Sequence, residues 1–342
     1  MSGIRFAKPA DIADIMNYID ENWKKGHILS NNRPFFLYEF QNLNRINFVI
    51  HRNNKNAIDG ILGFICSSKI PSDIWTVMWM VSPDGASLGL GVKLLLYLKK
   101  SDDYRVLSSP GINPQTINIY KFLKMHTGIL NHYVMMNATL NEFDIAKIRK
   151  KITIKPFNFI ASDDYKLIPL NEDMLQFDFD MLKQYVPFKD EDYFIKRYFR
   201  HPIYNYNVYA ISKGRNNESI LVTRNVTVKG KQAVRIVDYL GAIENLKYIA
   251  KNLNDKIIEN NYEYIDFVCL GFDHKSLLEA GFVKFDLESD YLIIPNYFEP
   301  FEQKNKTINY FIDTKNSRKV RIVKADGDQD RPSQAIEKAK NE

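Results

Sequence analysis

The same order of predicted strands and helices occurs twice along the chain, and this repetition restricts the fold more than any other feature. Strands are expected where apolar, β-branched and aromatic residues cluster, and helices where apolar residues follow helical spacing. The span from Val81 to Met125 is 44 residues and the span from Leu240 to Phe282 is 42, which predicts two copies of one α/β fold with a mixed sheet. Each copy has a strand, helix, strand, helix and strand, expected at 75–81, 89–100, 105–109, 114–125 and 131–136, and at 234–240, 244–260, 264–270, 275–280 and after Phe282.

The length agrees with two domains. A chain of 342 residues gives two domains at roughly 150 residues each. We expect a first domain over residues 1–145, a linker over 146–157, a second domain over 158–300, and a C-terminal extension with a charged tail over 301–342. Further strands are expected at 4–8, 47–51, 58–67, 165–170, 207–212 and 219–228, and further helices from residue 9 and at 171–185 and 191–198.

Composition excludes several classes of protein. Hydrophobic residues make up 45% and charged residues 26%, as in an ordinary globular chain. Cys66 and Cys269 are the two cysteines, too few for a disulfide framework or a four-sulfur zinc site. The sequence has no apolar run long enough to span a membrane and no apolar segment typical of a secretory signal near the N-terminus. We therefore expect a cytoplasmic protein with no membrane partner.

The charge favours a small phosphate-bearing ligand over nucleic acid. Lys and Arg number 47 against 41 Asp and Glu, a net charge of +6. A nucleic-acid surface needs a larger basic excess, clustered on one face. No basic stripe follows a predicted helix, so we expect no nucleic-acid partner.

Two glycines separate the strand at 75–81 from the helix that follows it. Gly89 and Gly91 would let a ligand approach the backbone, and the helix start offers free N–H groups and a partial positive charge. Such a site suits a pyrophosphate. The residues do not form a Walker loop or a dinucleotide fingerprint, because the required lysine and third glycine are missing. Close packing of helix on sheet would equally explain both glycines.

A second group of residues lies on the next predicted helix. Asn113, Thr116 and Tyr120 are spaced at i, i+3 and i+7, which places them on one helix face. Together with the glycine loop, they resemble the GNAT superfamily of acyl-CoA-dependent N-acyltransferases. The family's fourth strand, Gly-x-Gly loop and third helix look like residues 75–100, and its Asn, small residue and Tyr look like these three. The resemblance covers roughly residues 1–140.

The resemblance implies acetyl-CoA as cosubstrate, no metal, and direct transfer without a covalent enzyme intermediate. The pyrophosphate would lie on the amides of residues 88–92, and the pantetheine beside the strand at 78–82. A backbone N–H near Met80 or Val81 would polarise the thioester, and Tyr120 would protonate the leaving thiolate, unless it is a packing residue. Cofactor-binding residues are therefore expected at Met80, Val81, Ser82, Ser87, Leu88, Gly89, Leu90, Gly91, Val92 and Asn113.

The chain departs from the family pattern in both halves. Ala86 stands where the family often has Gln or Arg, and residues 75–81 contain no Glu, Asp or His to act as a base. In the second half, Leu270 and Leu277 occupy the positions of the Asn and the Tyr, and the loop after the strand has the single glycine Gly241. The second domain is therefore expected to be a degenerate copy.

Acceptor-binding residues are expected at His27, in a polar loop of the first half, at Arg33, and at Arg331 in the tail. Two interpretations of the tail remain open: a solvated disordered end, or a basic strand followed by a loop that contacts phosphate or sugar. The run at 326–332 resembles tails of acyltransferase-like proteins from bacterial surface-polysaccharide pathways, such as those of O-antigen biosynthesis.

These resemblances imply an N-acetyltransferase that acts on the amine of a nucleotide-linked amino sugar. Two alternatives remain: an aminoacyl or peptidyl-type transferase on a tandem GNAT fold, and a non-catalytic binding protein. The mild charge argues against the former, whereas the missing base and Ala86 favour the latter.

Overall fold

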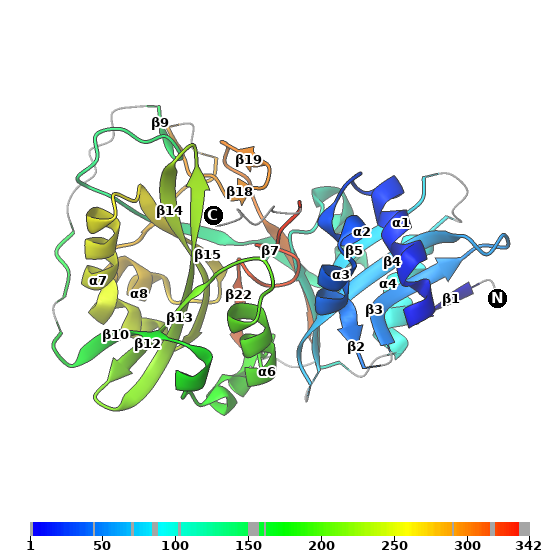
Figure 1. Ribbon diagram of the computed structural model, residues 1–342, viewed down its shortest axis with the longest axis horizontal. Helices are drawn as coiled ribbons and strands as arrows, with labels where there is room; N and C mark the ends of the chain where they lie inside the picture. The colour runs from blue at the N-terminus through cyan, green and yellow to red at the C-terminus, as the bar shows by residue number, and fades with distance from the viewer. Residues whose placement is uncertain are drawn as a thin grey trace, which may run out of the picture. The chain divides into compact units, whose positions relative to one another are not determined.

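The computed structural model describes residues 3–43, 45–69, 72–83, 88–101, 104–149, 157–160, 162–288, 291–314 and 319–334. The chain forms two compact units, each with its own sheet (Figure 1). Unit 1 consists of Met1–Thr127, Tyr310–Ser317 and Asp326–Glu342, and unit 2 of Gly128–Asn309 and Arg318–Ala325. This division differs from the expected boundary at residue 145, because each unit takes segments from both halves of the chain.

The sheet of unit 1 has the order β1-β3-β4-β5-β6-β20-β7, with β2 paired to β3. The described pairings are antiparallel except that of β5 with β6, which is parallel. Its strands are β1 (Gly3–Ala7), β2 (Gln41–Asn42), β3 (Arg45–Arg52), β4 (Ile58–Ser68), β5 (Asp73–Val81), β6 (Val106–Pro110), β7 (His126–Ile129) and β20 (Asn309–Thr314).

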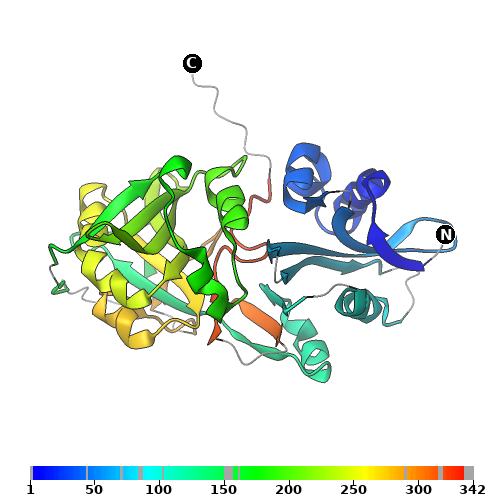
Figure 2. The same ribbon diagram turned by 90° about the horizontal axis from the view of Figure 1, so that it is seen from below.

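Helices cover both faces of this sheet (Figure 2). On one face the rings of Phe36 and Phe40 pack against Phe48 of β3, with centroids 5.6 Å and 4.6 Å away. On the other, Leu94 and Leu98 are wholly buried in a core of apolar side chains. The first face carries α1 (Ile12–Asn22), α2 (Ile28–Asn31) and α3 (Arg33–Phe40), and the second α4 (Leu90–Ser101) and α5 (Ile117–Phe122), with the short turns η1 (Pro9–Asp11) and η2 (Pro114–Thr116) before α1 and α5.

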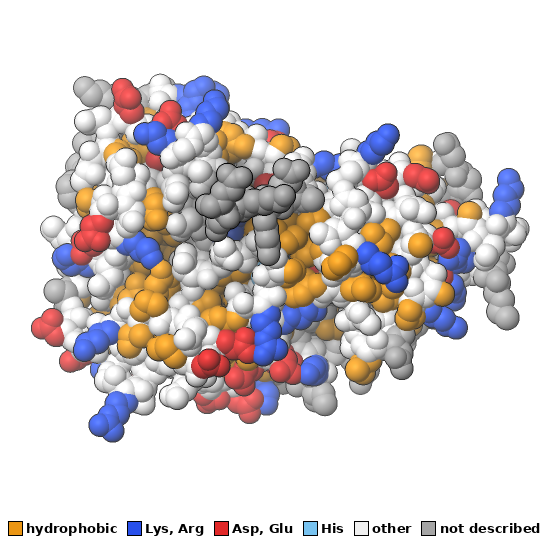
Figure 3. All heavy atoms as spheres, viewed as in Figure 1, with side chains coloured by type: hydrophobic (Ala, Val, Ile, Leu, Met, Phe, Trp, Pro, Cys, Tyr) orange, Lys and Arg blue, Asp and Glu red, His pale blue; other side chains and the backbone are white. Residues whose placement is uncertain are grey.

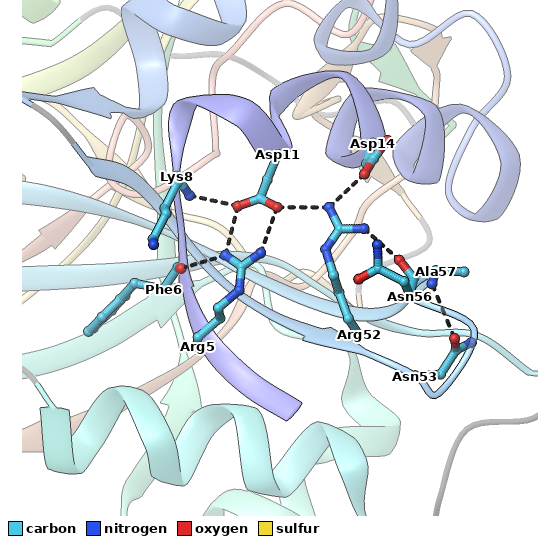
Figure 4. Close-up of polar contacts among 9 residues, drawn as sticks. All are labelled: Arg5, Phe6, Lys8, Asp11, Asp14, Arg52, Asn53, Asn56 and Ala57. Atoms are coloured by element: carbon cyan, nitrogen blue, oxygen red, sulfur yellow. Dashed lines mark hydrogen bonds and ion pairs between the residues drawn. The ribbon is translucent and has the colours of Figure 1, made fainter. Parts of the chain in front are cut away.

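An ion-pair cluster fixes the start of α1 to the strands beneath it (Figure 4). The Asp11 carboxylate accepts two hydrogen bonds from Arg5, of 2.7 and 2.8 Å, one of 2.7 Å from Arg52 and one of 2.8 Å from the Lys8 N–H. Burial alone would raise the pKa of Asp11, but these donors hold it well below its usual range. The cluster joins β1, β3 and η1 through one side chain.

The sheet of unit 2 has the order β10-β12-β13-β14-β15-β8-β16, with β22 also paired to β15. The pairing of β14 with β15 is parallel, and the other described pairings are antiparallel. Its strands are β8 (Asn131–Met136), β10 (Tyr165–Leu170), β12 (Asn207–Lys213), β13 (Asn216–Val228), β14 (Lys231–Gly241), β15 (Tyr264–Leu270), β16 (Val283–Lys284) and β22 (Ile322–Val323).

The helices of unit 2 include α6 (Glu191–Phe194), the π-helix η5 (Ile195–Phe199), η6 (Ile243–Asn245), α7 (Leu246–Glu259) and α8 (His274–Glu279). The helix expected over 171–185 is wrong: this stretch forms two 3₁₀ turns, η3 (Glu172–Met174) and η4 (Phe179–Gln184). Asn171 and Asp178 each cap a new turn with their side chains, which interrupts a continuous helix. Short two-stranded ladders join β11 (Tyr185–Val186) to β21 (Lys319–Val320), β9 (Lys147–Ile148) to β17 (Leu292–Ile293), and β18 (Tyr297–Phe298) to β19 (Phe301–Glu302).

The two halves of the sequence exchange a strand. β8, from the first half, lies between β15 and β16 in the sheet of unit 2, and β20, from near the C-terminus, lies between β6 and β7 in unit 1. The interpretation of the tail as a disordered end is therefore wrong for residues 319–334. Ile322, Ala325 and Asp326 are wholly buried there, because the segment packs into the units.

Within the described residues, no helix is long and apolar enough to cross a membrane. On the face drawn in Figure 3, positive and negative side chains are interspersed.

Candidate active site

Strands β5 and β6 of unit 1 separate part-way along their length. Their parallel ladder runs from Asp73, opposite Val106, to Trp75, opposite Ser108, and no described pairing follows. Beyond this point the Ser109 hydroxyl donates to the Thr76 carbonyl over 2.8 Å. The rest of β5 stays paired with β4 on its other side. One edge of β5 is therefore left without a neighbouring strand from about residue 77 onwards.

A bulge accompanies this separation. The register of β4 against β5 shifts between Ile61 and Gly63, and Met78 has a positive φ of 48°. Such a bulge bends a strand and increases its twist. After the bulge, the Ser82 N–H donates to the Asp59 carbonyl of β4 over 2.9 Å. Because successive N–H groups along a strand point to opposite edges, the Val81 N–H faces the unpaired edge, whereas those of Met80 and Ser82 face β4.

The two glycines of the loop have different roles. Gly89 has a φ of +77°, and a Cβ built there would meet nothing within 4 Å, so it makes a left-handed turn into open space. At Gly91 a Cβ would lie 3.2 Å from Trp79 Nε1, and this indole N–H donates to the Gly91 carbonyl over 3.0 Å. Close packing therefore explains Gly91, and the turn explains Gly89. Residues 84–87, with the predicted Ser87, lie outside the described residues.

The N-terminus of α4 faces this turn. The Lys93 N–H makes the first intrahelical bond, to the Gly89 carbonyl at 3.0 Å. The N–H groups of Leu90, Gly91 and Val92 precede it, and these are donors that a helix leaves without internal acceptors. Leu88 is fully exposed beside them. These donors and the helix dipole can bind an anion.

Tyr120 lies against the unpaired part of β5. Its ring is 2% exposed, stacks on Phe311 with centroids 4.1 Å apart, and lies 5.7 Å from the Trp79 ring. Burial raises the pKa of Tyr120 well above its ordinary value, an effect that a hydrogen bond with Thr116 opposes. The phenol is therefore protonated at neutral pH, as a general acid must be.

Asn113 lies at the surface and caps the turn before α5. Its Oδ1 accepts from the Gln115 N–H at 3.0 Å, and its carbonyl accepts from the Thr116 hydroxyl at 2.7 Å. Polar contacts thus link Asn113 to Thr116 and Thr116 to Tyr120, although Asn113 has extended backbone and precedes the turn η2, so the three residues do not share one face of a single helix.

The predicted acceptor residues lie apart from the glycine loop in sequence. His27 is 9% exposed and caps α2, because its Nδ1 accepts from the Leu29 N–H at 3.2 Å. Burial, followed by the charge of Lys24, lowers the pKa of His27 to about 4, so the ring is neutral at pH 7. Arg33 is exposed at the start of α3.

Arg331 has a charged partner. Its guanidinium forms an ion pair with Glu39 of α3, and its Nε donates to the Gly327 carbonyl at 2.7 Å. Both side chains are nearly buried, with exposures of 9% and 4%. The positive charge expected to bind a diphosphate is therefore compensated inside unit 1.

Unit 2 has the same separation of strands, but its own chain fills the opening. β14 and β15 pair from Val234, opposite Ile265, to Ile236, opposite Phe267. Beyond this point β22 pairs with β15 instead, and the Ala325 N–H donates to the Val237 carbonyl of β14 at 3.2 Å. The C-terminal segment thus lies between the two strands that have separated.

The C-terminal segment also contacts the loops that follow β14 and β15. The Arg321 guanidinium donates to the Gly241 carbonyl at 2.7 Å, at the loop that corresponds to the glycine turn of unit 1. Gly271 has a φ of +81°, and the Val320 carbonyl occupies the space that a Cβ there would need. Leu277, wholly buried, accepts a backbone bond from Phe282 just as Tyr120 accepts one from Met125.

Trp79 and residues 319–330 were not among the predicted site residues; in the C-terminal segment the prediction named Arg331 alone. The sequence does contain a feature that could have predicted Trp79, because a large ring two residues before the end of a strand can cover a nearby glycine. The C-terminal segment has none, because nothing local to residues 319–334 specifies which strands they join.

Two solved structures resemble this arrangement across nearly the whole chain. A GCN5-related N-acetyltransferase from Anabaena variabilis is 9% identical and superposes with a TM-score of 0.54 over 92% of this chain and 73% of its own. A conserved protein from Enterococcus faecalis, described as a probable N-acyltransferase, is 6% identical, with a TM-score of 0.53 over 90% and 72%. No protein-family model and no curated protein matches the sequence.

At such low identities the likeness concerns the fold. The predicted fold class is confirmed: the chain has mixed α/β sheets and a two-domain GNAT fold.

Proposed function

We propose that this protein is an acyl-CoA-dependent N-acyltransferase whose acyl-CoA site lies in unit 1. The observation that carries the proposal is the unpaired edge of β5, which leads from Trp75 to the open turn at Gly89 and the N-terminus of α4. An extended pantetheine can add to such an edge as a strand does. The helix start then receives the pyrophosphate.

The proposed transfer is direct. The Val81 N–H, on the unpaired edge, binds the cofactor, and a neutral amine attacks the thioester carbonyl. The carbon–nitrogen bond forms as the carbon–sulfur bond breaks, and Tyr120 gives its proton to the leaving thiolate. The proton that the attacking nitrogen loses passes through solvent and restores the Tyr120 phenol. The position of Tyr120 beside Trp79 supports this role.

Unit 2 takes no cofactor in this proposal. The segment around β22 occupies the space between β14 and β15, and Leu277 replaces the tyrosine. One acyl-CoA per chain is therefore expected.

For the finer assignment we propose acetyl-CoA as donor and the amine of a nucleotide-linked amino sugar as acceptor. The support is the resemblance of residues 326–332 to tails of polysaccharide-pathway proteins, together with the mild positive charge.

The test is a panel assay. Acetyl-, butyryl- and myristoyl-CoA are each incubated with amino-sugar nucleotides, and release of free thiol is followed. We expect thiol release with acetyl-CoA and at least one amino-sugar nucleotide, and calorimetry with one acetyl-CoA bound per chain. Failure to bind any acyl-CoA would reject the proposal, and two equivalents bound would reject the assignment to unit 1 alone.

A further inference from the structure

A histidine of unit 2 that the proposed transfer does not use is buried near the edge of the sheet. His132 is 1% exposed and lies on β8, which pairs with β15 over all six of its residues. On its other edge β8 pairs with β16 at Val283 and Lys284. Beyond this short ladder, the Phe285 N–H donates to the His132 carbonyl at 3.0 Å and holds Phe285 against β8.

The side chain of His132 shares a carboxylate with an arginine. Asp266 accepts from Arg235 Nε and Nη2 at 3.0 and 2.7 Å, and its Oδ2 lies 2.8 Å from His132 Nε2. Burial alone would raise the pKa of Asp266, but the charge of Arg235 lowers it to about 2. An ionised carboxylate can only accept, so Nε2 of the neutral imidazole carries the proton and Nδ1 is an acceptor.

The other ring nitrogen of His132 has no such contact. Nδ1 is buried and has no hydrogen-bond partner among the described residues. The ring of Phe285 packs edge-on against the imidazole, with centroids 4.9 Å apart. A proton on Nδ1 would therefore create a charged donor without an acceptor, which is more costly in the interior than the bare acceptor.

Protonation would also add a cation where one is already present. The charged groups that act on His132 are Asp266 of β15, Arg235 of β14 and Lys324, which is 2% exposed and follows β22. Burial lowers the pKa of His132, the Asp266 carboxylate raises it, and Arg235 and Lys324 lower it. Because Asp266 already balances the Arg235 guanidinium, a charged imidazole would have to share that carboxylate. The closed structure therefore favours neutral His132.

Solvent approaches this group through a pocket in unit 2. The pocket has a volume of about 410 Å³, and both His132 and Phe285 belong to its lining. The lining also includes the exposed side chains of Lys284, Asp286, Glu288 and Thr307. Because Phe285 lies against the imidazole and also lines the pocket, its displacement would let water reach Nδ1.

We propose that His132 is a proton-operated latch, which in its neutral form keeps Phe285 closed against β8 and in its protonated form opens this edge of unit 2. The proton comes from solvent in the pocket and binds Nδ1, and the new N–H donates to water once Phe285 has moved. This device is independent of the proposed acyl-CoA site, which lies in unit 1.

The direction of the pH dependence follows from the two forms. In the closed form the pKa of His132 lies below its ordinary value of 6.5, whereas in the open form the hydrated ring titrates near that value. The open form therefore binds more protons below pH 6.5, and the equilibrium shifts towards opening as the pH falls.

The test is native-state hydrogen exchange on the full-length protein, measured at the Phe285 amide between about pH 7 and pH 5. This amide is chosen because its bond to the His132 carbonyl breaks on opening. Dividing each rate by the intrinsic rate at the same pH gives the opening equilibrium. The variant is His132→Gln, since glutamine keeps an N–H donor for Asp266 and does not titrate. The matched control is His126→Gln, which removes an exposed histidine on β7.

We expect the opening equilibrium at Phe285 to rise about tenfold for each pH unit below about pH 6 in the wild type and in the control, as the uptake of one proton requires. In His132→Gln it should not change with pH, whereas a merely structural histidine would change its level and leave the slope intact. A flat profile in the wild type would overturn the proposal whether or not His132→Gln folds. An undiminished slope in His132→Gln would assign the proton to another group and would overturn it as well.

Discussion

Tyr120 combines two properties that the sequence could not separate. It is a core residue, because Phe311 and Trp79 pack on its ring, and Trp79 belongs to the part of β5 whose edge is unpaired. His27 likewise serves as a helix cap while staying neutral at pH 7. At the residue scale, packing and proposed chemistry use the same side chains.

Replacing Tyr120 with phenylalanine separates the two properties. Tyr120→Phe keeps the ring stacked on Phe311, so the free energy of unfolding should change by no more than about 1 kcal/mol for the lost Thr116 contact. Without the acid, kcat should fall about 100-fold while acyl-CoA affinity holds. The control is Tyr97→Phe, which removes a hydroxyl on α4 that has no proposed role. Wild-type turnover in Tyr120→Phe, with chemistry rate-limiting, would make Tyr120 a packing residue.

His27 should make stability depend on pH. Its pKa is about 4 in the folded protein, against 6.5 as the ordinary value. The unfolded chain therefore binds more protons between these values, and the free energy of unfolding should decrease as the pH falls from 6.5 to 4. The capping variant His27→Asn should lose this part of the slope, as measured by urea unfolding at several pH values. Identical slopes in both proteins would show that His27 titrates normally.

At the scale of elements, β5 and its bulge decide where a ligand can lie. The bulge at Met78 shifts the register with β4, and the pairing with β6 ends nearby. The turn at Gly89 then carries the chain into α4. In unit 2 the corresponding opening is closed by β22, so the same element arrangement gives an open site in one unit and a filled one in the other.

A carboxylate at the turn tests the open site. Gly89→Asp places a negative charge where the pyrophosphate is expected; nothing lies within 4 Å of the new Cβ, and the backbone strain from the positive φ is shared by the control variant. We expect calorimetry to show no acetyl-CoA binding. The matched control is Gly230→Asp, also at a positive φ with open space around it, which should bind normally. Normal affinity in Gly89→Asp would move the pyrophosphate site elsewhere.

For the whole molecule, the exchange of β8 and β20 makes the halves of the sequence dependent on each other. Each sheet takes an internal strand from the other half, so neither half contains all of its own sheet. The C-terminal segment continues this pattern, since residues up to Ala325 belong to unit 2 and those from Asp326 to unit 1.

Cutting the chain tests this dependence. A fragment of residues 1–145 lacks β20, so β6 and β7 lose the strand between them and expose edges that promote aggregation. We expect this fragment to show no cooperative thermal unfolding by circular dichroism. Co-expression with residues 146–342 should restore a folded, acetyl-CoA-binding protein. A fragment 1–145 that folds and binds acetyl-CoA alone would contradict the role of β20.

Local patterns in the sequence were enough for most elements near the site. The strand before Gly89, the helix after it and the helix that carries Tyr120 follow from periodicity, turn residues and spacing, which act over a few neighbouring residues. The left-handed turn at Gly89 agrees with the same local signal. The acyl-CoA-binding and catalytic roles of these residues remain predictions.

Strand pairing between segments that are distant in sequence determined the remaining features of the fold. A β-strand satisfies its hydrogen bonds with a partner that can be distant in sequence, so residues 309–314 and 319–334 carry no local sign of the strands that they join. Which sheet received β20 and which opening received β22 were decided by the packing of the complete chain, because only there do the edges left unpaired by one half meet the segments supplied by the other.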